Sequence, residues 1–287
     1  MIVLPTQDSQ QRANHCRAIL DIDREKARWA GQSAVEIIHR GGYVHNGIWI
    51  DLSAAITKEK QNKQSLSPDA VLPLPTKYEY QTTVQIVNES SLMAARRFSK
   101  RGVVPLVLNF ANGVSPGGGF LHGSRAQEET LCFASTLYAS LVGDPFYDRH
   151  RKRSDKASSP HTILSEATVF RDDVYENLSL PWKMGVMTCA APVCLVGEIE
   201  GVQAQKLMEE RIRRVLAIAH TYDYQHLVLG AWGCGAFRND PLHIARCFRR
   251  VIETEQRGAF AEIVFAISDW SADRRFLGPF HQAFQAG

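Results

Sequence analysis

The sequence lacks the features that mark several large classes of protein. No apolar run approaches the roughly 18 residues that a membrane span needs, and the apolar start Met1–Pro5 is too short for a signal peptide. The formal net charge of +3 is too small to favour nucleic acid binding. The 6 cysteines include no C-x-x-C pair, which argues against a zinc ribbon. We therefore expect a soluble, cytoplasmic protein with no membrane partner and no direct contact to nucleic acid.

The composition is that of a globular protein. Of the 287 residues, 45% are hydrophobic and 22% are charged, and this length is near the upper limit for one α/β domain. Residues 11–39 predict one or two helices, residues 44–52 predict a short strand or hairpin, and a Pro-Leu-Pro sequence at 73–75 interrupts regular structure. We interpret residues 1–80 as a mainly helical N-terminal extension, packed on a core of residues 81–287 in one structural unit.

From residue 82 onward, strand and helix patterns alternate. Short apolar runs of the kind that form buried strands occupy residues 83–87, 103–109, 184–190, 226–231 and 263–267. Helices are predicted over residues 91–101 and, from apolar positions spaced by 3.6 residues, over 208–219 and 244–252. The alternation predicts an α/β fold with a largely parallel sheet that helices cover on both faces. The stretch from residue 144 to 160, which carries the basic run Arg149–Arg153, is interpreted as an exposed loop.

A glycine triplet, Gly117–Gly119, stands seven residues ahead of the acidic sequence Gln127–Glu129. The segment follows a predicted strand and leads into a predicted helix, which Ser124 would cap in a capping-box pattern with Gln127 and which would continue to residue 141. Glycines let main-chain N–H groups approach a phosphate, and carboxylates can do proton chemistry at a glycosidic bond. The alternative is that the acids only complement the helix dipole. The adjacent glycines favour the functional interpretation.

A second glycine-rich loop, Gly230–Phe237, also follows an apolar strand and precedes a helix, here with Asp240 as N-cap and Pro241 in the first turn. Because carboxyl ends of parallel strands lie at one edge of a sheet, the two loops should flank the crevice in which open α/β sheets bind ligands. Neither loop has the P-loop or G-x-G-x-x-G pattern. Two such loops in matching positions favour a diphosphate site, and the alternative is a pair of tight turns.

Other candidate sites are weaker. His243 and Cys247 are one helical turn apart, but no further metal ligands cluster near them, so we expect no metal site. Cys234, within the second loop, has no adjacent base that would make it a nucleophile, and a packing role is the better interpretation. We expect no cofactor.

Together, these motifs resemble those of the macrodomain-type poly(ADP-ribose) glycohydrolases. The shared elements are Asn-x-Ala-Asn at 109–112, the glycine triplet, Gln-Glu-Glu after a similar gap, and a second loop similar to the diphosphate loop of that family. The N-terminal extension and the Pro-Leu-Pro region further resemble the microbial branch, so the likeness covers most of the chain. The resemblance implies a macrodomain-like three-layer α/β/α fold with a mixed sheet of six or seven strands. It also implies hydrolysis of the ribose–ribose bond of poly(ADP-ribose).

The resemblance implies a role for each site residue. Glu129 would be the catalytic acid and base, Glu128 would orient the ribose at the scissile bond, and Gln127 would support the catalytic loop. The residues implied to contact the distal ribose and the diphosphate are Asn112, Gly117, Gly118 and Gly119. The residues implied to surround the diphosphate are Gly233, Cys234, Gly235 and Ala236, with Phe237 packing against the ribose or limiting access. The partner would be poly(ADP-ribose) or an ADP-ribosylated protein, and ADP-ribose the product.

The chemistry can be checked against the residue spacing. Neighbouring residues on a helical turn point in different directions, so we expect that Glu128 and Glu129 cannot flank a glycosidic bond as the carboxylates of ordinary glycosidases do. A single acid, Glu129, would then protonate the leaving ribose and afterwards activate water. A general acid needs a raised pKa, whereas a helix N-terminus lowers the pKa of a carboxyl. Burial by Phe120 or Phe237, or the phosphates of the ligand, would have to overcome that effect.

Two alternatives stay open at this point. An enzyme of the same fold could remove mono-ADP-ribose from protein side chains, because it would share the ADP-ribose pocket. A non-catalytic ADP-ribose-binding module would also share the pocket, but the intact glutamate pair argues against it.

Overall fold

The computed structural model describes residues 1–77, 79–152, 159–194 and 201–285. Within these residues, one eight-stranded sheet has the order β1-β5-β10-β9-β6-β8-β7-β4. In that order the strands are β1 (Ile2–Val3), β5 (Thr83–Val87), β10 (Glu262–Ala266), β9 (His226–Leu229), β6 (Leu106–Phe110), β8 (Asn177–Cys189), β7 (Thr162–Arg171) and β4 (Gln64–Leu66). Neighbouring strands from β1 to β8 in this order are parallel. Strand β7 pairs antiparallel with both β8 and β4. The sheet is therefore mixed, as the resemblance implies.

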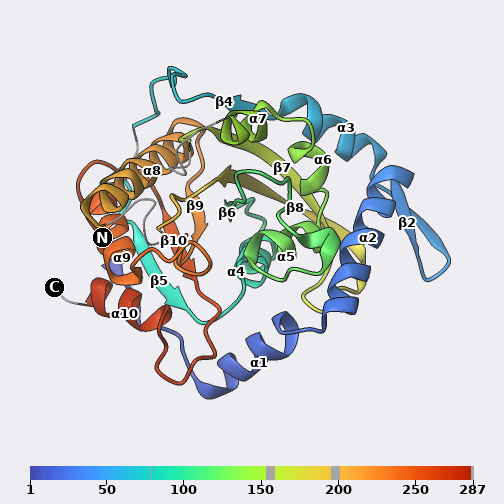
Figure 1. Ribbon diagram of the computed structural model, residues 1–287, viewed down its shortest axis with the longest axis horizontal. Helices are drawn as coiled ribbons and strands as arrows, with labels where there is room; N and C mark the ends of the chain where they lie inside the picture. Colours follow the sequence, from blue (N-terminus) through green and yellow to red (C-terminus); the bar gives the residue numbers. More distant parts are fainter. Residues whose placement is uncertain (78, 153–158, 195–200, 286–287) are drawn as a thin grey trace.

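Helices cover both faces of this sheet (Figure 1). One face is covered by α8 (Gly201–Thr221), α9 (Pro241–Glu253) and α10 (Leu277–Gln285), and the other by α2 (Arg24–Arg40), α4 (Ser91–Ser99), α5 (Gln127–Ala134), α6 (Leu137–Leu141) and α7 (Pro145–Arg151). Side chains alternate along β6, where Leu106 and Leu108 join the first helical layer and Val107 joins the second. The three-layer α/β/α fold is confirmed. No helix in the described ranges is both long and apolar enough to cross a membrane.

Helix α9 shows why these segments adopt their structure. Asp240 accepts a hydrogen bond from the N–H of Leu242 at 3.0 Å, and Pro241 begins the helix, so the predicted N-cap is confirmed. The apolar face of α9 is buried, and its Phe248 ring lies 5.3 Å from Phe265 of β10. Capping and an apolar stripe together place this helix on the sheet beside the end of β9.

The first 80 residues are mainly helical, as predicted. They contain α1 (Gln10–Leu20), α2, the hairpin β2 (Gly42–His45) and β3 (Ile48–Asp51), and α3 (Ser53–Asn62). They also supply β1 and β4, which are the two edge strands of the central sheet. The implied count of six or seven strands is therefore wrong, because two short strands from this segment extend the sheet. A domain division at residue 80 stays a prediction.

The predicted exposed loop at residues 144–160 is also wrong over part of its length. Residues 145–151 form helix α7, in which Phe146 and Tyr147 are fully buried, and Arg153 of the basic run lies outside the described residues. The charged residues dominate the sequence pattern here. Two aromatic side chains that reach the core nevertheless fix the helix.

Arg171 at the end of β7 joins the N-terminal segment to the core. Its guanidinium, only 2% exposed, donates to the Ala30 carbonyl at 2.9 Å and the Ser33 hydroxyl at 2.9 Å in α2. It also donates to the Phe133 carbonyl of α5 at 3.1 Å. Burial lowers the pKa of Arg171 to about 10, so it stays charged at neutral pH. One buried cation thus links α2, α5 and the sheet.

Replacing this cation should destabilise the whole fold. Arg171→Met removes the buried guanidinium that bridges α2, α5 and β7, so we expect the free energy of unfolding to fall by about 2–4 kcal/mol in urea denaturation. Lys183→Met is the matched control, because Lys183 makes a partly exposed ion pair with Glu166 at 3.8 Å. That change should cost less than about 1 kcal/mol. Equal unfolding midpoints for the two variants would contradict the proposed link.

Candidate active site

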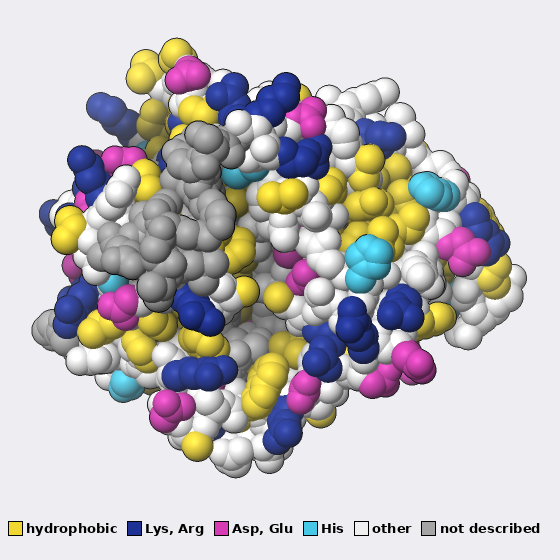
Figure 2. Space-filling model, viewed as in Figure 1, with side chains coloured by type: hydrophobic (Ala, Val, Ile, Leu, Met, Phe, Trp, Pro, Cys, Tyr) yellow, Lys and Arg dark blue, Asp and Glu magenta, His cyan; other side chains and the backbone are white. Residues whose placement is uncertain are grey.

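The two glycine-rich loops meet at the carboxyl edge of the parallel strands. The first loop, residues 111–126, follows β6 and includes the short helix η1 (Phe120–His122), and the second loop, residues 230–240, follows β9. Between them lies a smaller cavity of about 150 Å³, whose lining includes the predicted site residues Asn112, Gln127, Glu128, Glu129, Gly233, Gly235, Ala236 and Phe237. It adjoins a larger cavity of about 270 Å³. Figure 2 shows a hollow on this face, with acidic side chains in its wall and Lys and Arg side chains along its rim.

Glu128 lies in the first turn of α5 and is almost completely buried. Its Oε2 accepts a hydrogen bond from the N–H of Asn112 at 2.7 Å, and its Oε1 accepts from the Asn109 side-chain amide at 3.3 Å. Burial and the nearby Glu129 carboxylate together raise the pKa of Glu128 to about 8, against the effect of these donors. Glu128 therefore retains a proton in much of the population at neutral pH.

Glu129 is also buried but has an incomplete set of partners. Its Oε1 accepts a hydrogen bond from the N–H of Gly119 at 2.9 Å. Its Oε2 is buried and has no hydrogen-bond partner among the described residues. An unpaired oxygen on a buried carboxylate destabilises a folded protein, which makes it a candidate ligand-binding group.

The absence of a side chain at Gly118 lets the two carboxylates approach the same point. A Cβ atom on Gly118 would lie 2.3 Å from Oε1 of Glu129 and 3.1 Å from Oε2 of Glu128. The backbone of Gly118 also has a φ of +62°, which L side chains rarely adopt. The expectation that the two side chains point in different directions is thus wrong at this place. The reason is that the first loop folds back over the first turn of α5.

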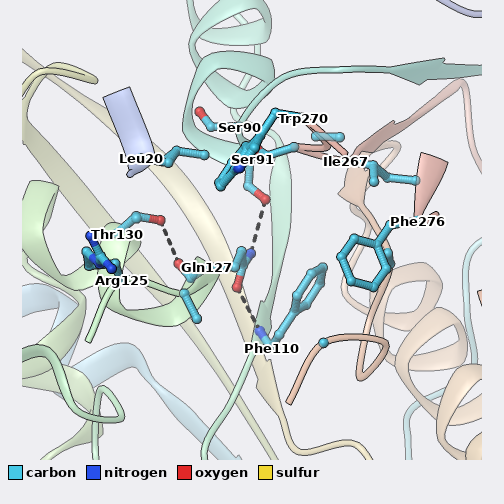
Figure 3. A pocket seen from close by; sticks show the side chains of 15 residues that line it. Leu20, Ser90, Ser91, Phe110, Arg125, Gln127, Thr130, Ile267, Trp270 and Phe276 are labelled. Carbon is cyan, nitrogen blue, oxygen red and sulfur yellow. Dashed lines mark hydrogen bonds between the residues drawn. The ribbon is translucent and has the colours of Figure 1, made fainter. Parts of the chain in front are cut away.

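Gln127 fixes the start of α5 to β6. Its side-chain oxygen accepts from the N–H of Phe110 at 2.9 Å, and its NH₂ group donates to the Ser91 hydroxyl at 3.1 Å (Figure 3). The NH₂ group also donates to the Leu108 carbonyl at 2.8 Å. The predicted capping box is therefore wrong. The residue before the helix is Ala126, which makes no side-chain cap, and Gln127 binds the strand instead of Ser124.

The predicted continuous helix to residue 141 is wrong as well. Helix α5 ends at Ala134, and the next residue, Ser135, is extended and forms a bridge with Val169 of β7 before α6 begins. The break fixes the C-terminal end of α5 against the sheet, as Gln127 fixes its beginning.

The second loop is held tightly at its base and open at its tip. A Cβ atom on Gly233, whose φ is +76°, would lie 2.7 Å from the side-chain nitrogen of Asn239, and that amide donates to the Gly233 carbonyl at 3.1 Å. Gly235 has nothing within 4 Å of the place where a Cβ atom would stand. Cys234 is buried, and burial raises its thiol pKa well above the ordinary value. A nucleophilic role for Cys234 is thus disfavoured, and packing fits better.

The structure does not place every predicted residue on a cavity wall. Gly117, Gly118 and Gly119 lie behind the carboxylates. A Cβ atom on Gly117 would lie 3.1 Å from the Cys132 sulfur. The Asn112 side chain accepts from the N–H groups of Val114 and Ser115 at 2.8 and 2.9 Å, so it shapes the first loop. These residues act in the site mainly through the backbone.

The larger cavity contains residues that the sequence motifs did not indicate. Its walls include Leu20 from α1, Ser90 at the start of α4, Arg125 from the first loop, and Trp270 and Phe276 beyond β10 (Figure 3). These segments are far apart in sequence. One feature of the sequence could have indicated this cavity: the predicted strands 83–87 and 263–267 end at the same edge of the sheet as the two glycine-rich loops.

The described residues contain no group of three or more His, Cys, Asp or Glu side chains that could hold a metal ion. On helix α9, the Cys247 sulfur lies 3.2 Å from Nε2 of His243. Two ligands alone make a poor metal site.

Comparisons with known proteins agree with this geometry. Residues 31–172 match the family model described as microbial-type PARG, catalytic domain. The structure of poly(ADP-ribose) glycohydrolase (PARG) from Thermomonospora curvata superposes with a TM-score of 0.86 at 33% identity, covering 91% of this chain and 100% of that chain. The Deinococcus radiodurans enzyme in complex with ADP-ribose gives a TM-score of 0.74 at 34% identity, covering 80% and 97%. No curated protein sequence shows significant similarity to the chain.

The family model, the two solved structures and the arrangement of the glutamates and glycine loops all lead to one assignment. The chain belongs to the family of microbial-type poly(ADP-ribose) glycohydrolases.

Proposed function

We propose that this protein hydrolyses the ribose–ribose O-glycosidic bond of poly(ADP-ribose) and releases ADP-ribose. The observation that carries the proposal is the meeting of two buried carboxylates at Gly118, beside a cavity bounded by two glycine-rich loops. The family assignment supports it, as do the similar structures that contain ADP-ribose or the inhibitor ADP-HPD. The six cysteines are free thiols, which fits the cytoplasmic location that we also propose.

The two cavities match the two ends of ADP-ribose. The smaller cavity, next to Glu128 and Glu129, would take the distal ribose, with Phe237 against the sugar. The diphosphate would lie between the loops, where Gly235 leaves room for backbone N–H groups to approach it. The larger cavity would take the adenosine, because Trp270 and Phe276 offer aromatic surface to a base.

Glu129 is the best candidate for the proton transfers. It would protonate the departing ribose oxygen as the bond to the anomeric carbon breaks and an oxocarbenium-like centre forms. Water would then attack that carbon and give its proton to Glu129, which restores the acid. The unpaired Oε2 of Glu129 is the oxygen available for this exchange, since Oε1 is held by Gly119.

Glu128 would orient the ribose and keep a proton in the glutamate pair. The raised pKa of Glu128, about 8, arises from burial next to a second carboxylate. At Glu129 itself, the phosphates of the bound ligand would favour the protonated form.

The proposed activity can be tested together with the proposed acid. The protein incubated with poly(ADP-ribose) should release ADP-ribose, and Glu129→Gln should slow the release by about 100- to 10,000-fold while ADP-ribose binding is retained. Glu166→Gln, at a partly exposed glutamate paired with Lys183, is the control and should act as the wild type does. If ADP-ribose is released only from mono-ADP-ribosylated proteins, these proteins are the substrate and poly(ADP-ribose) is not. Binding without release from either substrate would identify a non-catalytic module.

The space at Gly118 can be tested by adding one methyl group. Gly118→Ala places a Cβ where Oε1 of Glu129 lies, so hydrolysis should fall by about 100-fold or more. Gly102→Ala is the matched control, because Gly102 also has a left-handed φ of +75° but nothing within 4 Å. Both changes should cost about 1–2 kcal/mol of stability from backbone strain. Similar rates for the two alanine variants would show that the carboxylates do not need this space.

The pH dependence of hydrolysis follows from the proton on Glu128. As pH rises through about 8, Glu128 loses its proton and kcat/KM should decline. Stability should decline at lower pH, between about 4.5 and 8, because a carboxyl whose pKa is raised from 4.5 to about 8 contributes its full stabilisation below 4.5 and loses that contribution as pH rises to 8. Urea unfolding at several pH values tests the second effect, and Glu128→Gln should flatten it. A flat rate profile up to about pH 9 would contradict a role for protonated Glu128.

A further inference from the structure

We propose that Asp269 is a positioning residue for the adenosine end of the substrate. It fixes Trp270 and Phe276 relative to each other and does not itself line the cavity between them. This role rests on the adenosine subsite of the proposed function and names the residue that shapes its aromatic wall.

One segment after β10 supplies much of the wall of the larger cavity. The residues of this segment that line the cavity are Ala266, Ile267, Ser268, Trp270 and Phe276 (Figure 3). Trp270 and Phe276 stand six residues apart, and the described residues 267–276 form neither helix nor strand. Regular backbone hydrogen bonds therefore do not set the distance between the two rings, so side-chain contacts must do so.

The carboxylate of Asp269 makes those contacts, and the residue is only 2% exposed. Its Oδ1 accepts hydrogen bonds from the N–H of Ser271 at 3.0 Å and from the Ser271 hydroxyl at 2.6 Å. Its Oδ2 accepts from the N–H groups of Phe276 at 2.8 Å and Leu277 at 3.1 Å. Burial opposes ionisation, but these donors lower the pKa of Asp269 below its ordinary value, so the carboxylate is charged at neutral pH. One anion thus joins the residue after Trp270 to Phe276.

The backbone of Asp269 is held by Asn88, a buried residue directly after β5. The side-chain amide of Asn88 donates to the Asp269 carbonyl at 2.7 Å, and its oxygen accepts from the Asp269 N–H at 3.0 Å. Arg274 holds the far side of the loop, where its guanidinium donates to the Ser271 carbonyl at 2.6 Å and to Asp8 at 2.9 Å. Asp269 therefore has a fixed place from which its carboxylate can hold the loop.

Capping of α10 alone does not account for these contacts. A helix cap needs only donors at the start of the helix, which here are the N–H groups of Phe276 and Leu277. The two bonds from Ser271 add nothing to the helix, but they fix the turn that follows Trp270. Contact residues that are held in place before binding lose less entropy when the ligand arrives. Asp269 should therefore set the affinity for the adenosine end and leave the proton transfers at the distal ribose unchanged.

The test is Asp269→Asn. In either orientation the new amide turns its NH₂ group toward N–H or O–H donors on one side, so the spacing between Trp270 and Phe276 is no longer fixed. We expect KM for poly(ADP-ribose) to rise roughly 10-fold and the affinity for ADP, measured by calorimetry, to fall by a similar factor. The kcat should stay within about twofold of the wild type, because only binding at a remote part of the substrate is weakened.

Asp144→Asn is the matched control. Asp144 is also 2% exposed, caps α7 through the N–H of Phe146 at 3.0 Å, and accepts from the Ser65 hydroxyl at 2.7 Å. It lies outside both cavities. Asp144→Asn should lower the urea midpoint but leave KM and the ADP affinity as in the wild type.

The split between KM and kcat separates positioning from simple support of the fold. A loss of folded protein lowers the apparent kcat at constant KM, and that result for Asp269→Asn would overturn the inference. Wild-type KM and ADP affinity would overturn it as well. When Trp270→Ala is already present, Asp269→Asn should raise KM by a smaller factor, because part of its effect acts through that ring. An equal factor in both backgrounds is the third result that contradicts it.

A milder variant carries the test if Asp269→Asn does not fold. Ser271→Ala removes one of the four donors to the carboxylate and should raise KM roughly threefold at constant kcat. An unchanged KM in this variant would overturn the inference.

Failure of the inference and failure of the proposed function look different. A wild-type protein that binds ADP but does not hydrolyse poly(ADP-ribose) contradicts the proposed hydrolysis, and the ADP affinities of the variants still decide the role of Asp269. A wild-type protein that hydrolyses the polymer but does not bind ADP contradicts the adenosine subsite and the role of Asp269 with it.

Discussion

The space beside the Cα atom of Gly118 is the constraint on which the site depends. A Cβ atom there would lie only 2.3 Å from Oε1 of Glu129 and 3.1 Å from Oε2 of Glu128, so any larger residue would displace Glu129. The rest of the local structure holds that arrangement: Gln127 ties the first turn of α5 to β6, and the N–H of Asn112 holds Glu128. Gly118 thus lets both carboxylates approach the backbone at one point.

Bringing two carboxylates into a buried site opposes folding, and the protein tolerates it for function. Burial holds a proton on Glu128 at neutral pH, and Oε2 of Glu129 is left without a partner among the described residues. The cost is offset by an extensive three-layer core and by polar links such as Arg171 between layers. The same desolvation that opposes folding raises the pKa of Glu128, which lies beside the proposed acid, Glu129.

The parts of the fold and site that were predictable are those encoded locally. Continuous apolar runs identified the parallel strands, and Asp240 with Pro241 fixed the start of α9. The residues around Gly118 and Glu129 were found because loop and acids are close in sequence. Tertiary contacts decided the rest: Gln127 binds β6 in preference to a capping box, and the aromatic residues of α7 outweigh its basic run. The larger cavity was not predictable from motifs, because its walls come from segments that are far apart in the sequence.

The most direct test of the central claim is a crystal structure of the protein with ADP-ribose bound. We expect the distal ribose against Gly118 and Glu128, with its anomeric carbon facing Oε2 of Glu129, and the diphosphate between the two glycine-rich loops. The adenine should lie in the larger cavity beside Trp270. A distal ribose bound away from both glutamates, or a diphosphate that contacts neither loop, would contradict the claim that these carboxylates act on the glycosidic bond.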